Sequence, residues 1–523
     1  MAFSLDFLQI KELLLQHGLL KETNIKGEGT VDFITYDSRE CSDGALFVCK
    51  GVHFKEEYFH SAKEKGFSCY MSETVYDSDS PYFLVNDIKK ALSVVSIAYY
   101  RRPSDSFKLT GITGTAGKTT TAYMIHSIMN AEAGKETGLI STNETYCGGE
   151  HKEAENTTPE SLKLQALFAE ARENKLPYVT MEVSSQAYSV DRVYDQIFDV
   201  GIFMNIDKDH IGGPEHPSYE HYRACKLEFI KNSRVVPVYA RTKELDMIID
   251  TAKETDCMLV LFDVFNDNLE IDKNSEINAV ETPDLKELEQ RLGRDIDFCF
   301  VDDVASLDTG GYSFVFHDAK GDTLNLSCDM TGFFNIINAC AAICAAKYLG
   351  VSDDAIIKGL SHVYVPGRMN LYRKENTTVI VDYAHNRLTL LEFLKSCKND
   401  YPGHRLCVVI GAAGKNHLRR DDIAGLCGKY ADYIYLTNED PDFEDPQEIC
   451  EDIASRIPDG GAPYEIITDR PEAIKKALAD CLSRDDKNII AILGKGSERF
   501  IKLHGRHVPC ESDSDVVEGL LST

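Results

Sequence analysis

The chain lacks a surplus of positive charge. Its 523 residues include 56 Lys and Arg against 85 Asp and Glu, which gives a formal net charge of −29. Proteins that bind nucleic acid without regard to sequence need a cationic surface for the phosphate backbone, so this composition argues against that class. A site for a single nucleotide stays possible, because a few local donors suffice to bind it.

Long apolar runs and closely paired cysteines are missing as well. The most apolar stretches, such as NACAAICAAKYLG, are too short to cross a bilayer. The 16 cysteines show no C-x-x-C spacing, and the start MAFSLDFLQIKELLLQHG carries acids and has no small-residue cleavage site. These features predict reduced thiols in a cytoplasmic protein without stable membrane association.

The order of apolar and polar segments predicts an α/β protein. The length of 523 residues predicts about three domains, because one hydrophobic core rarely exceeds about 250–300 residues. Short strand-like and helical runs alternate over residues 1–106, and a second unit covers residues 107–364, in which the part near 240–325 gives no clear pattern. Over residues 365–523 strands and helices alternate regularly, which predicts a Rossmann-like, mostly parallel sheet covered on both faces. Ligands bind such sheets at the carboxyl ends of the strands.

The most informative segment is GITGTAGKTT at residues 111–120, which lies between an apolar strand-like stretch and a helical pattern. This order is that of a phosphate-binding P-loop on a central parallel sheet, with backbone N–H groups around an anion. Lys118 would then reach the outer phosphates, and the Thr119 hydroxyl would bind Mg²⁺. The motif's first glycine is displaced, because Ile112 holds its position. A plain glycine turn before a helix is the alternative.

Three polar residues in the central unit have both a chemical and a structural interpretation. Glu182 ends the strand-like run YVTME and is either a Mg²⁺ ligand near the P-loop or a solvated strand end. His210 follows another strand, where it either binds a divalent ion or is exposed. Lys226 lies in the helical segment HYRACKLEFI, and its spacing alone favours a stem packed on an apolar face with the ammonium in water.

The last unit places polar side chains at strand ends. Arg368 in PGRM suits phosphate, and Asp382 in VDYAH suits a ribose hydroxyl, although an ion pair and a loop turn are equally simple interpretations. The loop LTNEDPDFEDP at residues 436–446 either attracts a substrate ammonium or is a solvated lead into a helix. Glycines in LGKGSER at residues 493–499 allow a close approach of the backbone.

Taken in order, these motifs resemble the Mur ligase family, and most closely the members that add the third residue of the peptidoglycan stem peptide. The resemblance covers nearly the whole chain. It includes DSRECSDGALFVCKG, GTAGKTT, NTTPES, EVSSQAYSVDRV, the D-H and Y-x-x-x-K elements, FNIINA, PGRM, DYAH and GKGSE. The sequence departs from the family at Ala116, where an Asn is usual, and at Gln186, where a His is usual.

The resemblance implies three groups of site residues. Those implied to bind ATP are Gly114, Thr115, Ala116, Gly117, Lys118, Thr119, Thr120, Asn335, Asn338, Arg368 and Asp382. Those implied to bind the substrates are Ser38, Thr157, Thr158, Ser184, Arg192, His385, Asn416, Glu439, Asp440, Asp442, Gly494 and Glu498. Those implied to act in catalysis or to bind two Mg²⁺ ions are Lys118, Thr119, Glu182, His210 and Lys226, the last as a carbamylated lysine.

The resemblance also implies the reaction. ATP would phosphorylate the D-Glu γ-carboxylate of UDP-MurNAc-L-Ala-D-Glu, and the amine of a free amino acid would displace phosphate from the acyl phosphate. No nucleic acid takes part, and we expect a monomer. The alternatives are a related ligase with another amino acid or acceptor and a nucleotide-binding scaffold without ligase activity.

The acidic loop bears on the choice of amino acid. Family members that add diaminopimelate carry D-N-P-R, whose arginine binds the distal carboxylate, but this chain has Asp442 in place of that arginine. A second family arginine aligns with Asn416. Because like charges at close range repel each other, the loop predicts L-lysine, or another diamino acid without a second carboxylate, over meso-diaminopimelate.

Overall fold

Three large β-sheets organise the chain in the computed structural model, which describes residues 3–51, 54–207, 215–265, 283–307 and 310–522. No helix within these ranges is long and apolar enough to cross a membrane. The three sheets follow one another along the chain, and helices pack against them. The protein is therefore an α/β protein, as the sequence predicts.

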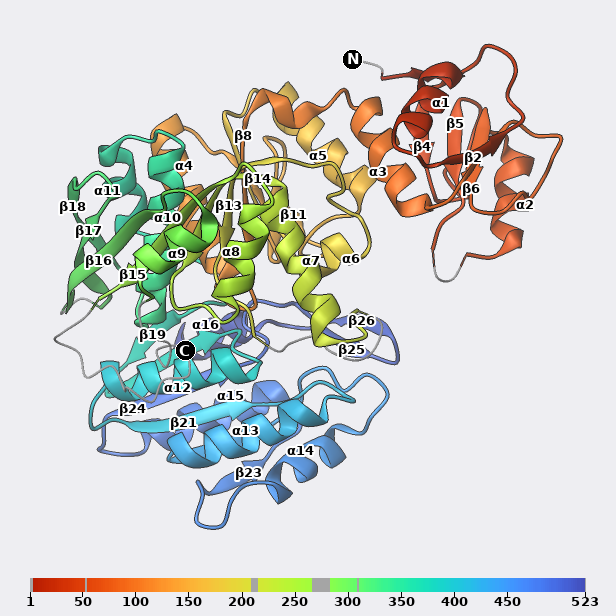
Figure 1. The fold of residues 1–523 in the computed structure, drawn as a ribbon. Helices are drawn as coiled ribbons and strands as arrows, with labels where there is room; N and C mark the ends of the chain where they lie inside the picture. The colour runs from red at the N-terminus through yellow and green to blue at the C-terminus, as the bar shows by residue number, and fades with distance from the viewer. Residues whose placement is uncertain (1–2, 52–53, 208–214, 266–282, 308–309, 523) are drawn as a thin grey trace.

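The N-terminal sheet has five strands in the order β2-β7-β6-β5-β4, parallel except for β2, and β1 pairs with β3 beside it. Figure 1 shows these elements, in red, at one end of the molecule. They are β1 (Leu5–Asp6), α1 (Phe7–Gln16), β2 (Leu20–Thr23), β3 (Thr30–Val31), β4 (Phe33–Thr35), β5 (Ala45–Val48), α2 (Glu56–Lys65), β6 (Cys69–Ser72), β7 (Tyr82–Val85) and α3 (Ile88–Tyr99). Helix α3 packs against α5 (Ser161–Glu173) of the central unit, and this contact joins the two units.

The central sheet has eleven strands in the order β11-β10-β9-β12-β8-β13-β14-β15-β16-β17-β18. The strands from β9 to β16 in this order run parallel, whereas the pairs at both edges are antiparallel. The first half comprises the 3-10 helix η1 (Pro103–Ser106), β8 (Lys108–Thr113), α4 (Lys118–Ala133), β9 (Gly138–Ile140), β10 (Glu144–Tyr146), β11 (Lys152–Glu153), α5 (Ser161–Glu173), β12 (Tyr178–Glu182), α6 (Ser185–Ser189) and β13 (Phe198–Phe203).

The second half of this unit includes the segment whose pattern was unclear in the sequence. It comprises α7 (Tyr219–Lys231), β14 (Ser233–Tyr239), α8 (Leu245–Lys253), β15 (Met258–Val264), α9 (Leu285–Leu292), β16 (Asp297–Ser306), β17 (Tyr312–His317), β18 (Thr323–Cys328), α10 (Phe334–Tyr348) and α11 (Asp353–Ser361). Strands β16 to β18 form an antiparallel edge, so the central sheet is mixed and not parallel throughout.

Helix α10 shows why its residues suit a buried position. Its sequence FNIINACAAICAAKY has apolar or small side chains all round, and most of them are fully buried. A helix that is apolar on every face is stable only when other elements surround it. Helix α10 accordingly packs against α4 and strands β14 and β15.

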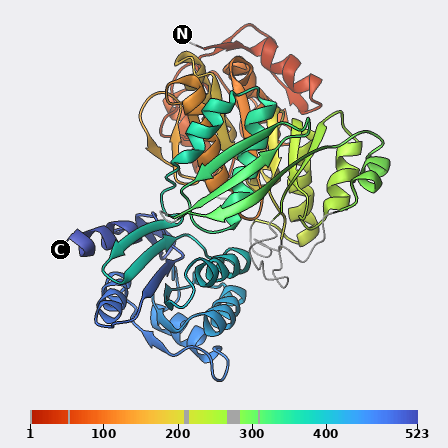
Figure 2. The same cartoon turned by 90° about the vertical axis from the view of Figure 1, so that its left-hand side faces the viewer.

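The C-terminal sheet has six strands in the order β19-β20-β24-β21-β22-β23, parallel except for β19. Figure 2 shows it, in blue, beneath the central unit. Its elements are β19 (Asn370–Lys374), β20 (Thr377–Asp382), α12 (Arg387–Asp400), β21 (Arg405–Ile410), α13 (His417–Tyr430), β22 (Tyr433–Leu436), α14 (Pro446–Ser455), β23 (Tyr464–Ile466), α15 (Arg470–Leu482), β24 (Asn488–Leu493), the hairpin β25 (Phe500–Leu503) and β26 (Arg506–Pro509), and α16 (Asp513–Ser522).

Candidate functional site

A cavity of about 280 Å³ lies where the central unit meets the C-terminal unit. Residues from the glycine loop, the ends of β12 and β13, the start of α10 and the segment after β20 line it. The predicted site residues in its wall are Thr115, Ala116, Gly117, Lys118, Thr119, Thr120, Thr157, Glu182, Asn335, Asn338, Arg368, Asp382 and His385. The tertiary structure thus brings together residues that are up to 270 positions apart in the sequence.

The glycine loop connects β8 to α4 in the way that a P-loop requires. Gly117 has φ of 85°, and a Cβ there would lie 2.5 Å from the Asn338 side-chain oxygen, so only glycine fits. The Lys118 ammonium donates to the Gly114 carbonyl at 2.8 Å. The backbone of Ala116 is fixed by Asn205, whose Oδ1 accepts the Ala116 N–H at 2.9 Å and whose Nδ2 donates to the Ala116 carbonyl at 3.2 Å.

Glu182 is fully buried at the end of β12. Its Oε1 accepts the Thr142 N–H at 2.8 Å, and its Oε2 accepts the Thr142 hydroxyl at 3.1 Å. The interpretation of a solvated strand end is therefore wrong. A buried carboxylate in the wall of this cavity is a suitable ligand for a hard divalent cation.

A second cavity, of about 340 Å³, shares a wall with the first. Both cavities are lined by Thr115, Lys118, Thr142, Thr157 and Tyr383. The second cavity is also lined by Gly114, Ser184, Arg192, Lys226 and Glu498. A ligand in the first cavity and one in the second would therefore meet at the Lys118 side chain.

Lys226 lies in the middle of α7 and is only 2% exposed. Its Nζ is 3.5 Å from the Thr113 hydroxyl and lies over the Tyr222 ring, 5.1 Å from the centroid. The interpretation of a lysine that extends its ammonium into water is therefore wrong. His210, the other predicted ligand of the second ion, lies outside the described residues.

The two threonines of NTTPES occupy different environments. Thr157 lines both cavities, whereas Thr158 is fully buried. The Thr158 hydroxyl donates to the Glu182 carbonyl and accepts the Ser184 N–H, both at 3.0 Å. Thr158 thus positions the strand end that carries Glu182, and it is not part of either cavity wall in the described structure.

Arg192 belongs to a series of ion pairs that extends to the N-terminal unit. Its Nη2 pairs with Glu160 at 2.8 Å, and Glu160 pairs with Lys50 at 2.5 Å. The Lys50 ammonium lies over the Tyr36 ring, 4.6 Å from the centroid. Ser38, two residues further on, lies half-buried in the turn after β4 and does not line the two cavities described above.

The segment after β20 is held by Asp382. Its carboxylate accepts the N–H groups of Met369 at 2.9 Å and Ala384 at 2.7 Å. Burial raises the pKa of Asp382, although the nearby Arg368 opposes this shift. The Arg368 guanidinium lies over the Tyr383 ring, 4.3 Å from its centroid. His385, which the resemblance implies as a substrate contact, lines the first cavity and not the second.

A third cavity, of about 390 Å³, lies at the carboxyl edge of the C-terminal sheet. Glu498 lines both this cavity and the second. The charged residues in its wall are the acids Glu439, Asp469, Glu498, Glu511 and Asp513 and the bases Arg470 and Lys495. With five acids and two bases, its wall has a formal excess of three negative charges.

The acids of the loop at 436–446 are already paired inside the protein. Arg419 donates to Glu439 at 2.7 Å, and Lys495 donates to Asp440 at 3.0 Å. Asp442 accepts the Gly505 N–H at 2.6 Å, and its carboxylate is 3.5 Å from the Lys502 ammonium. The loop is therefore less open to an external cation than its sequence suggests.

Neighbouring residues explain how this edge is held together. Although burial by itself lowers the pKa of Lys495, the carboxylates of Glu498 and Asp440 raise it overall, so Lys495 stays an ammonium between them. Gly494 has φ of 108°, and a Cβ there would lie 2.5 Å from the Glu439 carboxylate.

Asn416 is exposed and accepts the Arg419 N–H at 3.2 Å as the N-cap of α13, away from the three cavities.

The motifs did not single out several residues that shape these cavities. Asn205 holds the glycine loop, Thr142 binds Glu182, and the Tyr383 hydroxyl donates to Glu498 at 2.7 Å. Asn205 follows β13 and Tyr383 follows β20 in the DYAH motif, so their position at strand ends was an available signal. Thr142 lies in ISTNET, a segment without a recognisable motif.

Comparisons with known proteins agree with this geometry. Residues 112–346 match the model of the Mur ligase middle domain, and residues 367–496 match that of the Mur ligase glutamate ligase domain. The chain is 34% identical to a UDP-N-acetylmuramyl-tripeptide synthetase of Lactobacillus acidophilus, over 98% of this chain and 96% of that protein. It is 33% identical to a UDP-N-acetylmuramoyl-L-alanyl-D-glutamate–L-lysine ligase of Enterococcus faecalis, over 99% of both chains.

The chain therefore belongs to the Mur ligase family, and it is an enzyme of the ligase class. A solved structure of a UDP-N-acetylmuramoyl-L-alanyl-D-glutamate–2,6-diaminopimelate ligase shares the fold, with a TM-score of 0.61 at 20% identity over 94% of this chain and 95% of that one. The family and the fold that the sequence predicted are thus confirmed.

Proposed function

We propose that this enzyme joins a free amino acid to the D-Glu γ-carboxylate of UDP-MurNAc-L-Ala-D-Glu in peptidoglycan precursor synthesis, with hydrolysis of ATP to ADP and phosphate. The observation that carries the proposal is the wall shared by the first two cavities, where Lys118 and Thr157 face both. ATP in the first cavity and the acceptor carboxylate in the second would meet at Lys118. There the γ-phosphoryl group would move onto the carboxylate oxygen.

The first cavity suits the nucleotide. Backbone N–H groups at the start of α4 and the Lys118 ammonium provide donors for the phosphates, and Asn335 and Asn338 line the same cavity. The oxygens of Thr119 and Glu182 fit a first Mg²⁺ ion, which when bound would neutralise charge on the transferring phosphoryl group. We assign the second ion to His210 and a carbamylated Lys226, on the resemblance and on the position of Lys226 in the cavity wall.

The second cavity suits the acceptor. Arg192 and Ser184 line it, and Ser38 lies in the unit that Lys50 and Glu160 connect to Arg192. Once the acyl phosphate has formed, the neutral amine of the amino acid attacks its carbonyl carbon, the C–O bond to phosphate breaks, and the amine loses a proton. Arg368 and Asp382 belong to the C-terminal unit, so closure of this unit would exclude water from the acyl phosphate.

The third cavity supports a diamino acid with no second carboxylate, L-lysine above all. Glu498 faces both the second and third cavities, so an amino acid whose α-amine lies near Glu498 can extend its side chain into the third. The formal excess of three negative charges in that wall favours a distal ammonium over a carboxylate. The Enterococcus faecalis relative is named as an L-lysine ligase.

We also propose that the chain is a monomer of three units, with boundaries near 106 and 364. Limited proteolysis should cut first near these positions, and light scattering should give the mass of one chain, 58.5 kDa. Protection of both positions, or a dimer mass, would contradict this part of the proposal without affecting the ligase activity.

Phosphate release tests the reaction. With UDP-MurNAc-L-Ala-D-Glu and ATP, we expect turnover with L-lysine, less with L-ornithine, and least with meso-diaminopimelate. Turnover with diaminopimelate alone would overturn the choice of amino acid, and absence of stimulation by every amino acid would favour a nucleotide-binding scaffold. Activity of Lys226→Ala restored by short carboxylic acids would support the carbamate.

A further inference from the structure

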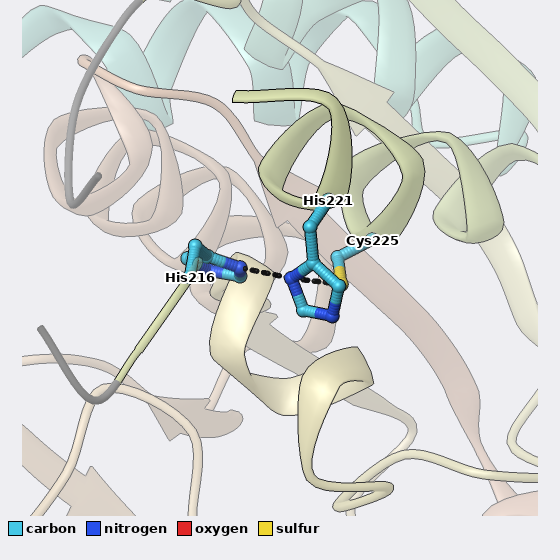
Figure 3. Close-up of side chains that lie close together, drawn as sticks. All are labelled: His216, His221 and Cys225. Atoms are coloured by element: carbon cyan, nitrogen blue, oxygen red, sulfur yellow. Dashed lines mark hydrogen bonds between the residues drawn. The ribbon is translucent and has the colours of Figure 1, made fainter. Parts of the chain in front are cut away.

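Two histidines and one cysteine lie together at the start of α7, apart from the residues assigned to ATP and Mg²⁺ (Figure 3). His216 precedes the helix, His221 lies in its first turn, and Cys225 lies one turn later. Because residues four apart share one face of a helix, His221 and Cys225 point to the same side, where His216 meets them. None of the functions proposed above uses these three side chains.

The distances between their ligand atoms match a metal site. The Nδ1 atoms of His216 and His221 are 2.9 Å apart, and the Cys225 Sγ is 3.9 Å from the His221 Nδ1. Each of the three residues has a ligand atom within 4.8 Å of those of the other two. A tetrahedral zinc ion with bonds of about 2.0–2.3 Å places such ligand atoms about 3.3–3.6 Å apart. The two distances given, between the histidine nitrogens and between His221 and Cys225, differ from those of a zinc site by less than half an ångström each.

The surroundings also suit a metal. His216 is fully buried, and Cys225 is 8% exposed. The other ring nitrogen of His216, Nε2, is 2.9 Å from the Ser185 hydroxyl at the start of α6. A histidine that binds a metal through one ring nitrogen usually donates the other N–H to a nearby oxygen, which sets its tautomer and orientation. Ser185 provides that oxygen.

We propose that His216, His221 and Cys225 bind one divalent transition-metal ion of borderline softness, with zinc as the probe of choice. Two imidazole nitrogens and a thiolate prefer zinc to magnesium, which takes oxygen ligands. On binding, the Cys225 thiol gives its proton to solvent, and water occupies the fourth position. The ion ties α7, the helix that carries Lys226, to His216 in the segment before it, and His216 in turn contacts Ser185 at the start of α6.

Metal titration of the full-length protein tests the site. Zinc alone, in competition with a chelating dye, should bind with one equivalent at this site, and Co²⁺ should give the near-ultraviolet band of a cobalt–thiolate bond. Cys225→Ser should abolish that band and weaken zinc binding by at least about 100-fold, because it removes a ligand. His221→Ala should weaken zinc binding to the same extent. Ser185→Ala, which leaves all three ligands in place, should weaken binding by only about 10-fold.

Controls separate this site from adventitious binding. Cys510→Ser and His60→Ala alter exposed residues elsewhere and should leave the zinc affinity and the cobalt spectrum unchanged. Thermal unfolding with a chelator should be alike for wild type and Cys225→Ser, and only the wild type should gain stability with zinc. A wild-type protein without the cobalt–thiolate band overturns the proposal, even where the variants fail to fold. An unchanged band in Cys225→Ser also overturns it.

Discussion

The glycine loop and the acidic loop at 436–446 both follow buried parallel strands, yet their charged side chains differ in what they face. At the glycine loop, Lys118 and the α4 N-terminus converge on a cavity, and Glu182 lines the same wall. At the acidic loop, Glu439, Asp440 and Asp442 are paired with cations and N–H groups of their own unit. Similar positions at strand ends thus give charges that line a cavity in one case and internal ion pairs in the other.

The difference implies that charge removal acts on turnover in the first region and on stability in the second. A carboxylate or ammonium that faces a cavity exchanges its protein contacts for ligand contacts. A charge in a buried ion pair does not meet the ligand, so removal of one partner leaves the other charge buried and unpaired. Variants in the two regions should therefore differ in whether they lose turnover or stability.

Lys118→Ala should have the largest effect. Loss of the cation at the wall shared by the two cavities should lower kcat for phosphate release by about 10³-fold, because charge on the transferring phosphoryl group is no longer stabilised. The urea midpoint should stay that of the wild type. Retention of more than a tenth of the wild-type activity would contradict the role of Lys118 in stabilising charge on the phosphoryl group.

Arg419→Ala should act on stability instead. It leaves Glu439 buried without its partner, and we expect a loss of about 3 kcal/mol in the free energy of unfolding, measured by urea denaturation. Arg484→Ala, which removes an exposed partner of Asp486, is the matched control and should leave the midpoint in place. In the double variant Arg419→Met with Glu439→Gln, part of the lost stability should return, since no charge is left unpaired.

Glu182→Gln should lower activity by about 10²-fold and raise the Mg²⁺ concentration that gives half-maximal rate, because a neutral amide is a weaker ligand for a hard cation. The fold should be unaffected, since the amide oxygen can still accept from Thr142. Thr142→Val is the milder comparison, because its backbone N–H remains a donor to residue 182. An unchanged Mg²⁺ requirement in Glu182→Gln would argue against the assignment of this ligand.

Asp442→Arg should have the smallest effect, a shift of about 10-fold in kcat/KM toward meso-diaminopimelate relative to L-lysine, as a cation replaces an acid in the loop that contributes Glu439 to the third cavity. Asp442→Asn is the control for the backbone, because φ at this position is 54° and Asn tolerates that conformation. It should move selectivity less than the arginine does. If Asp442→Arg leaves selectivity unchanged, the acids that line the third cavity determine it.

Sequence patterns predicted much of the fold and part of the candidate site. The regular alternation after residue 365 predicted the C-terminal sheet, because parallel strands and their helices leave a strong apolar period. The antiparallel edge β16 to β18 had no comparable pattern and was not predicted. Among site residues, Glu182 and Lys226 had two interpretations each in the sequence, and their burial excludes the solvated one in both cases.

The family, the glycine loop and the order of the motifs follow from the sequence alone, because they depend on residues close together in the chain. The tertiary structure alone decided which charges face a cavity and which are paired. Arg419 is twenty residues from Glu439, and Lys495 is fifty-five from Asp440, so no local pattern reports these pairs. It also brought His216, His221 and Cys225 within reach of one ion and set Ser185 behind them. Electrostatic interactions depend on distance in space, and only folding sets that distance.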